Sequence, residues 1–367
     1  MSLLEESAEL HQRVRAFARA ALGAEAPRAR EGFEPLALDI ARFQARWSPG
    51  YARLVAASGD RLDHAATLPA VPAEAFRITR VALHDAALDA ARFETSGTTA
   101  AARGQHALRD VETYRELSLL YGARALTSDA PGRRTVVALA PRPTVPPTSS
   151  LGFMMQAFMV AFDDRALADR WLLSDAGVDV AGLEGAACRA LQAGEPLLVL
   201  ATSFALAFLL EALGHHRIAC PKSTVVMQTG GFKGRTREIA PAELRARVAA
   251  VFGISEARVI GEYGMTELSS QLYEGTLPGG ALAGPPGVYL PPPWLRVDAV
   301  DPATLAPVAP GDTGIARFID LANVDSAVAV VTQDRVRNVS GGIELLGRLS
   351  GAPARGCSLA IESLVAG

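Results

Sequence analysis

Residues 197–227, LLVLATSFALAFLLEALGHHRIACPKSTVVM, contain the pattern that decides the fold. The apolar run over residues 197–201 predicts a strand buried on both faces. Ser203 precedes a helix predicted over residues 204–213, and Gly214 follows it, as is typical of the two ends of a helix. Residues 223–227 form a second apolar run. This alternation of strand and helix predicts an α/β fold.

The same pattern extends in both directions along the chain. Residues 135–139 and 258–261 predict two more buried strands, and Pro241 and Gly253 mark the ends of another helix. The Ala-rich N-terminal part shows helical spacing, whereas Pro-rich and Gly-rich turns after Gly279 separate short strand-like segments. We therefore expect four parts: a helical segment over residues 1–90, an α/β nucleotide-binding core over residues 91–279, a β subdomain up to a hinge over residues 280–348, and a short tail over residues 349–367.

Composition limits the class of protein. With 49% hydrophobic and 20% charged residues the chain is globular. A net charge of -3 and 6% aromatic residues argue against nucleic acid as a partner. Three cysteines are too few for a disulfide framework, and neither a signal peptide nor an apolar run of roughly 20 residues is present. We expect a cytoplasmic protein without a membrane span.

A hydroxyl-rich loop is the first candidate for chemistry. Ser96, Gly97, Thr98 and Thr99 follow a predicted strand and precede a run of small residues. Small residues let backbone N–H groups approach phosphate oxygens, and the hydroxyls add further donors. The lysine of a P-loop is absent. By itself this string is more typical of an ordinary turn.

A second candidate is the segment 261–267, GEYGMTE, at the end of the strand predicted over residues 258–261. Ligands of open α/β sheets bind at the carboxyl ends of strands. Tyr263 can stack on a base, and Glu267 is a carboxylate able to hold Mg²⁺ beside a nucleotide triphosphate. The alternative is a strand-exit turn with Tyr263 in the core and Glu267 capping a helix.

Four motifs in a fixed order give the chain a family resemblance. SGTT at 96–99, YGMTE at 263–267, TQD at 332–334 and Gly347-Arg348 occur in the order typical of acyl-adenylate-forming (ANL) enzymes. Within that superfamily, residues 68–364 resemble the acyl-protein synthetase (LuxE-type) branch known from bacterial luminescence operons. The resemblance implies the large N-terminal domain of an adenylating enzyme, with two helix-flanked sheets and a small β subdomain. It also implies a ligase that uses ATP and Mg²⁺ to convert a carboxylic acid, for this branch a fatty acid, to acyl-AMP.

The resemblance assigns expected roles residue by residue. Ser96, Gly97, Thr98 and Thr99 would hold the ATP phosphates, Gly230 and Gly231 would line the adenine slot, and Tyr263 would stack on the base. Thr266 would touch the α-phosphate, Glu267 would hold the metal, Asp334 would accept from the ribose, and Arg348 would lie near the ribose at the hinge. From the residues alone, Asp334 could equally be a turn residue, Arg348 a surface cation and the glycines a tight bend.

Two features distinguish this chain from most adenylating enzymes. Only 19 residues follow Arg348 and none is lysine, so we expect the usual C-terminal cap domain and its lysine to be missing. Lys233 is the candidate replacement, and the alternative is a solvated side chain. The resemblance also implies that Cys357, beside Arg355, accepts the acyl group as a thioester, because a nearby cation lowers a thiol pKa. Otherwise Cys357 is a small buried side chain.

The acyl pocket and the final acceptor remain open from the sequence. The apolar runs over residues 149–159 and 204–210 could line an acyl slot, although such spacing is more typical of a core. The LuxE-type resemblance implies a partner protein that accepts the acyl group, either a reductase or a carrier. The alternatives are a ligase for acyl- or aryl-CoA or acyl-carrier protein, and a non-catalytic nucleotide-binding subunit of a biosynthetic complex.

Overall fold

The fold is built around one mixed sheet of 11 strands. The computed structural model describes residues 1–23, 31–95, 103–163, 165, 170–230, 239–349, 360, 361 and 364. The strands are β1 (Val71–Pro72), β4 (Thr135–Leu139), β7 (Leu197–Thr202), β8 (Val225–Thr229), β9 (Val259–Tyr263), β10 (Leu272–Glu274), β11 (Val288–Leu290), β12 (Leu295–Val300), β13 (Thr313–Asp320), β14 (Ala329–Val339) and β15 (Gly342–Arg348). Their order is β12-β13-β14-β15-β11-β10-β9-β8-β7-β4, with β1 paired to β14. The α/β class is confirmed.

The expected two separate sheets are joined into one in the described part of the chain. Strands β4, β7, β8 and β9 pair in parallel, as buried apolar runs predict. Strand β10 then pairs antiparallel with both β9 and β11, and β11 pairs with β15. These two short strands make the antiparallel part a continuation of the parallel part.

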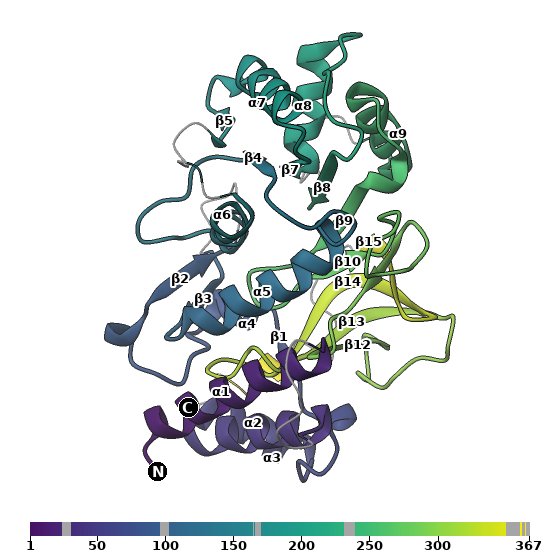
Figure 1. The fold of residues 1–367 in the computed structure, drawn as a ribbon. Helices are drawn as coiled ribbons and strands as arrows, with labels where there is room; N and C mark the ends of the chain where they lie inside the picture. The colour runs from purple at the N-terminus through teal and green to yellow at the C-terminus, as the bar shows by residue number, and fades with distance from the viewer. Residues whose placement is uncertain are drawn as a thin grey trace.

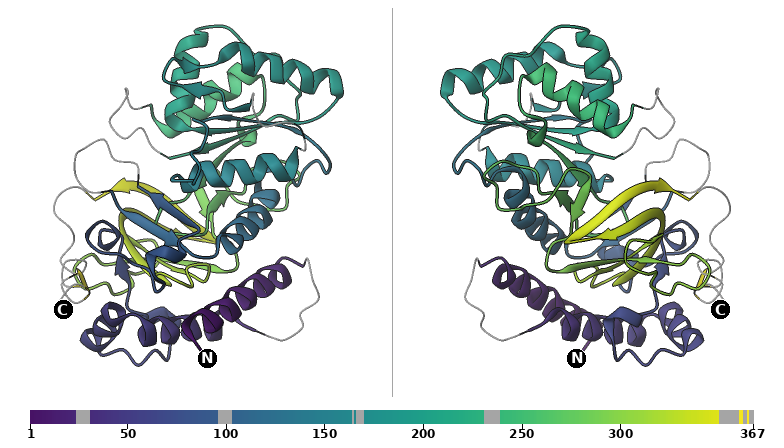
Figure 2. Two further views of the ribbon diagram at one scale, coloured as in Figure 1. Left: turned by 90° about the vertical axis from the view of Figure 1, so that its left-hand side faces the viewer. Right: turned by 90° about the vertical axis from the view of Figure 1, so that its right-hand side faces the viewer.

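Helices cover both faces of the parallel strands (Figures 1 and 2). Alternate residues of these strands enter different cores: Val137 and Val199 pack with helices α7, α8 and α9, whereas Ala138 and Leu198 pack with α5 and α6. Four methionine and phenylalanine side chains of α6 are fully buried in the core. Their burial agrees with the interpretation of residues 149–159 as part of the core. The helices are α1 (Leu3–Ala21), α2 (Phe33–Trp47), α3 (Pro49–Ser58), α4 (Ala75–Ile78), α5 (Val111–Leu126), α6 (Ser150–Phe162), α7 (Val180–Ala193), α8 (Ser203–Leu213) and α9 (Pro241–Phe252).

Local signals fix most of the element ends. Helix α9 starts at Pro241, and Gly253 closes it in the left-handed region at φ 59°, as predicted. Helix α8 is capped one residue earlier than predicted: Thr202 is extended, and its hydroxyl accepts from the N–H of Ala205 at 3.1 Å. Ser203 is already helical and uses its hydroxyl elsewhere. Strand β8 begins at Val225, two residues later than predicted, because the N–H of Thr224 donates to Pro221 O in a turn.

The N-terminal helices lie against the antiparallel part of the sheet (Figure 2). Helix α1 begins with a capping box in which Ser2 and Glu5 satisfy each other's backbone N–H groups. Its apolar face buries Leu10 and Val14 in the large core. Strands β2 (Ala91–Glu94) and β3 (Gln105–Leu108) form a hairpin beside this assembly, and β5 (Leu173–Ser174) pairs with β6 (Gly177–Val178). No described helix is long and apolar enough to cross a membrane.

Candidate active site

Tyr263 and Asp334, two residues singled out in the sequence, are in direct contact. Tyr263 ends β9, and its hydroxyl donates a 2.7 Å hydrogen bond to Asp334 Oδ2 on β14. Its ring is stacked on Phe318, with centroids 5.9 Å apart and planes inclined by 19°. Burial and the adjacent Asp334 charge raise the pKa of Tyr263 well above its usual value, so the phenol stays protonated. One face of the ring is therefore occupied by the protein, and Tyr263 is only partly buried.

This contact requires a strongly curved sheet. Strands β9 and β14 are separated in the strand order by β10, β11 and β15. In a flat sheet, four spacings of about 4.8 Å would hold them about 19 Å apart. The short antiparallel strands therefore curl, and the end of the parallel part faces the antiparallel part across the candidate site.

Thr266 lies beside the strand that leads to the hydroxyl-rich loop. Its hydroxyl donates to the carbonyl of Glu94, the last residue of β2, at 3.4 Å. Thr95 and Gly104 are joined by two 2.9 Å hydrogen bonds at the base of the intervening segment. The chain therefore leaves β2, two residues before Ser96, next to the YGMTE segment.

Glu267 carries an unusual carboxyl. The side chain is only 6% exposed, and burial raises its pKa to about 7, with the charges of Glu74 and Asp334 acting in the same direction. Arg348 and the backbone N–H of Glu267 itself oppose this rise. A cation placed at this carboxyl would offset the cost of burying its charge.

The acidic side chains fit a magnesium ion that is held partly by phosphate. Glu74 Oε2 is buried and has no hydrogen-bond partner, and its charge acts on Glu267. No group of three or more His, Cys, Asp or Glu side chains in the described ranges is arranged to bind a metal by itself. Mg²⁺ commonly binds one or two carboxylates and completes its shell with water and substrate phosphates. Glu267 and the Glu74 carboxylate are compatible with that mode.

Gly230 directly follows β8, beside a second buried carboxyl. It has φ 70°, a conformation that favours glycine, and its carbonyl accepts from Ser203 Oγ at 2.6 Å. Thr229 is opposite Glu262 in the sheet, and its hydroxyl donates to the Glu262 carboxylate. Burial raises the pKa of Glu262 to about 7, although the Thr229 hydrogen bond lowers it. A hydrogen-bonded polar pair thus lies next to the expected adenine slot.

Arg348 is the last residue of β15 and lies opposite Asp334 in the sheet register. The pairing is irregular between Asp334 and Val336, where the two strands shift relative to each other. The Arg348 side chain is exposed, and its charge acts on both Tyr263 and Glu267. The structure thus places a cation near the group formed by Tyr263, Glu267 and Asp334.

Several predicted site residues lie outside the described residues: Ser96, Gly97, Thr98, Thr99, Gly231, Lys233 and Cys357. Their roles stay predictions. The residues that the structure brings together are Tyr263, Thr266, Glu267, Asp334 and Arg348.

Sequence reasoning missed two buried polar residues that contact the YGMTE turn. His106 on β3 and Asn323, between β13 and β14, bond to the carbonyls of Thr266 and Glu267, respectively. Both side chains are inaccessible to solvent. No local pattern pointed to them: His106 lies in GQHALRD, residues 104–110, and Asn323 lies in DLANVDS, residues 320–326, and both segments mix polar and apolar residues.

Comparison with known proteins places the fold. No protein-family model matches the sequence, and no curated protein matches it. The structure is similar to 2-hydroxyisobutyryl-CoA ligase in an open conformation with 2-HIB-AMP and CoA, at TM-score 0.58 and 13% identity, over 85% of this chain and 73% of the ligase. The same ligase in the postadenylation state with R3-HIB-AMP aligns over 90% of this chain and 68% of the ligase, also at TM-score 0.58 and 13% identity. The chain therefore has the fold of a CoA ligase that was captured with 2-HIB-AMP.

Proposed function

We propose that this protein uses ATP to activate a carboxylic acid as an acyl-adenylate. One observation carries the proposal: Tyr263, Thr266, Glu267 and Asp334 converge, beside the end of β2, in a fold shared with a ligase captured with 2-HIB-AMP. These are the residues that the order of the motifs assigns to the nucleotide.

The proposed chemistry follows from where these groups lie. The acid's carboxylate attacks the α-phosphate of ATP, and the bond between that phosphorus and the pyrophosphate oxygen breaks. Tyr263 stacks on the base, Asp334 accepts from the ribose, and Arg348 lies near that sugar. Thr266 touches the α-phosphate, and Glu267 would hold Mg²⁺, which would neutralise charge on the phosphates.

The residues outside the described ranges complete this proposal. Ser96, Gly97, Thr98 and Thr99 hold the phosphates, and Gly231 lines the slot with Gly230. Lys233 supplies positive charge near the phosphates. Removing one such preorganised donor costs about 2.7–4 kcal/mol of transition-state stabilisation in comparable sites.

Acid-dependent exchange between pyrophosphate and ATP tests the first step. We expect exchange with at least one member of a panel of fatty, aromatic and amino acids, and a loss of about 100-fold or more in the Glu267→Gln variant, which keeps the size but not the charge. Absence of exchange with every acid tested would favour a non-catalytic nucleotide-binding subunit.

The second step is proposed as acyl transfer to a thiol. A thiolate attacks the acyl carbon and AMP leaves. Following the LuxE-type resemblance, Cys357 is the first acceptor, the acid is a fatty acid, and a reductase or carrier protein receives the acyl group next.

Substitution of Cys357 separates the two steps. We expect Cys357→Ala to keep acid-dependent exchange and to abolish a stable acyl-protein adduct, measured with radiolabelled acid after denaturing electrophoresis. Cys188→Ala is the control and should retain the adduct. Loss of exchange together with the adduct would show that Cys357 serves structure or adenylation instead.

Transfer to free CoA is the competing proposal, and the similarity to a CoA ligase bound to CoA favours it. Incubation with ATP, the active acid and CoA discriminates between the acceptors. A thioester in the small-molecule fraction would contradict transfer to Cys357.

A further inference from the structure

We propose that His106 and Asn323 are positioning residues that fix the backbone of the Thr266–Glu267 turn, and with it the carboxylate that binds Mg²⁺·ATP. This inference rests on the proposed function. It concerns two side chains that do not reach the nucleotide themselves and act through the two carbonyls that they hold.

His106 holds the first carbonyl. Its Nδ1 lies 2.8 Å from Thr266 O, and its Nε2 lies 2.9 Å from Ser326 Oγ. A carbonyl only accepts, so Nδ1 carries the proton and Nε2 accepts from the Ser326 hydroxyl. The ring is fully buried and packs edge-on against Phe76, with centroids 5.5 Å apart. Burial lowers the pKa of His106 to about 4, which keeps this neutral tautomer at neutral pH.

Asn323 holds the second carbonyl. Its Nδ2 donates to Glu267 O at 2.9 Å and to Ala327 O at 3.0 Å, and its Oδ1 accepts from Ser269 Oγ at 2.7 Å. The orientation of the amide is fixed because both carbonyls require a donor. Successive carbonyls on either side of the Glu267 Cα are therefore bonded to buried side chains from outside the turn.

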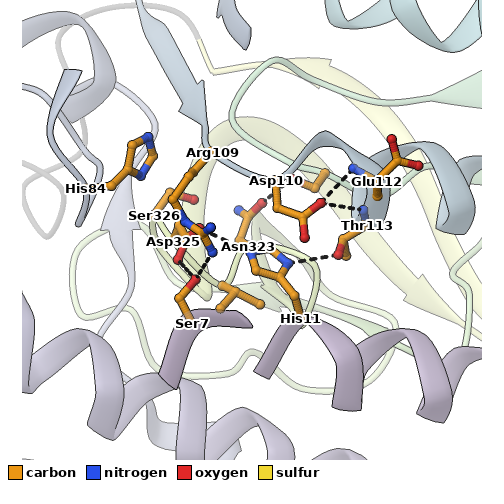
Figure 3. Close-up of polar contacts among 12 residues, drawn as sticks. Ser7, His11, His84, Arg109, Asp110, Glu112, Thr113, Asn323, Asp325 and Ser326 are labelled. Atoms are coloured by element: carbon orange, nitrogen blue, oxygen red, sulfur yellow. Dashed lines mark hydrogen bonds and ion pairs between the residues drawn. The ribbon is translucent and has the colours of Figure 1, made fainter. Parts of the chain in front are cut away.

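The loop between β13 and β14 that carries Asn323 and Ser326 is itself anchored to the N-terminal helices. Gln44 of α2 donates to the carbonyls of Asn323 and Val324 at 2.8 and 2.9 Å. In Figure 3, Ser7 and His11 of α1 and Arg109 converge on Asp325. His11 Nε2 lies 3.1 Å and Arg109 Nε 3.3 Å from Asp325 Oδ2.

The hydrogen bonds of His106 and Asn323 indicate that these residues orient the turn, and do not only fill space in the core. The Thr266–Glu267 segment is a turn, so these two carbonyls lack the regular partners of a strand or helix. A small shift of a turn moves the side chain that it carries, and catalysis is sensitive to displacements of about 1 Å. Residues that orient a metal-binding group typically change metal affinity or activity by about 10–100-fold when they are substituted.

Two pairs of variants test the proposal. His106→Ala removes both hydrogen bonds of the His106 ring, and Asn323→Ala removes all three of the Asn323 amide. His106→Asn keeps a donor near the Nδ1 position, and Asn323→Asp keeps the shape without the donor. Leu183→Ala, in the core on the opposite face of the parallel strands, controls for a general loss of stability.

Two measurements read the result. One is the Mg²⁺ concentration needed for calorimetric binding of α,β-methylene-ATP, and the other is kcat and KM for acid-dependent exchange. We expect His106→Ala, Asn323→Ala and Asn323→Asp to raise the Mg²⁺ midpoint and lower kcat by about 10–100-fold, with a smaller change in KM for the acid. His106→Asn should recover much of both losses, and Leu183→Ala should change neither.

The outcomes separate the two proposals. Alanine variants that match Leu183→Ala in both measurements, or a His106→Asn variant no better than His106→Ala, would overturn the positioning roles. A wild-type protein that binds the analogue with Mg²⁺ but exchanges with no acid would refute the proposed function, and the binding data would still decide the positioning roles. A wild-type protein without Mg²⁺-dependent binding would refute both.

Discussion

At the scale of single residues, Glu262 illustrates the cost of a carboxyl buried at the end of a sheet. Glu262 is 5% exposed. In the described part of the chain its carboxylate accepts a hydrogen bond from the uncharged hydroxyl of Thr229. Its pKa is about 7 in the fold against a usual value of 4.5. The folded protein therefore holds an additional proton between these two pH values, and the stability of the fold decreases as the pH rises through this window.

Glu262→Gln is predicted to stabilise the protein in a pH-dependent way. The carboxyl is already neutral at pH 5, so the substitution should change the free energy of unfolding little there. At pH 8 the gain should approach about 3 kcal/mol, since each pKa unit is worth about 1.4 kcal/mol. Urea unfolding at both pH values measures this difference. An equal effect at pH 5 and pH 8 would show that Glu262 is not buried as described.

Sequence motifs could identify individual residues of the candidate site but not their contacts. The order of the motifs pointed to Tyr263, Thr266, Glu267 and Asp334. The hydrogen bond between Tyr263 and Asp334 depends on the curl of three intervening strands, which no local pattern encodes. His106 escaped detection for a related reason: its partners, Thr266 O and Ser326 Oγ, are 160 and 220 positions away.

At the scale of elements, helix α1 is fixed to the rest of the chain by a buried ionic cluster. Asp325 is 4% exposed and contacts Ser7, His11 and Arg109. Burial acts to raise its pKa, but the hydrogen bonds from His11 and Ser7 and the charge of Arg109 outweigh burial and hold it below 3.8. The stability that this carboxylate contributes is present above pH 3.8 and is lost as the pH falls through its lowered pKa.

Asp325→Ala is predicted to reduce the free energy of unfolding by about 3–5 kcal/mol at pH 7, because it leaves His11 and Arg109 without their buried partner. The loss should shrink as the pH falls through the lowered pKa of the wild-type carboxyl. Glu6→Ala on the same helix is the matched control. Glu6 pairs with Arg46, whose side chain is 60% exposed, so its removal should cost less than about 1 kcal/mol. Equal losses in the two variants would contradict the ionic anchoring of α1.

Element positions were the part of the fold that the sequence predicted best. The apolar runs at 135–139 and 197–201 and the Pro241 to Gly253 helix lie within a residue or so of β4, β7 and α9. The cap of α8 was misplaced because Thr202 and Ser203 are both good capping residues. The tertiary hydrogen bonds of the Ser203 hydroxyl with Thr229 and Gly230 distinguish the two residues.

At the scale of the whole molecule, the two cores share the same strands. Leu198 packs on the α5 and α6 side, whereas Leu206 of α8 packs against the opposite face. Because neither core can open without exposing strands of the other, unfolding should be a single cooperative transition. The sequence did not predict that the parallel and antiparallel parts form one sheet, because the pairing through the short strands β10 and β11 leaves little trace in the sequence.

Leu198→Ala and Leu206→Ala are therefore predicted to lower the temperature of the same transition, each costing about 2–5 kcal/mol. Far-ultraviolet circular dichroism and calorimetry should give coincident curves for the wild type and both variants. A second transition in Leu206→Ala alone would show that the helix-rich face unfolds independently.

The curl of the sheet also affects which insertions the chain can accommodate. The distance between Tyr263 and Asp334 is set by the pairing of β10, β11 and β15 between them, and not by the lengths of the connections. The turn near Pro278 and Gly279 is exposed and lies outside these strands. Relatives with longer or shorter segments there can keep the tyrosine and the aspartate in contact. One extra residue inside β10 would instead reverse the faces of the side chains that follow and disturb that spacing.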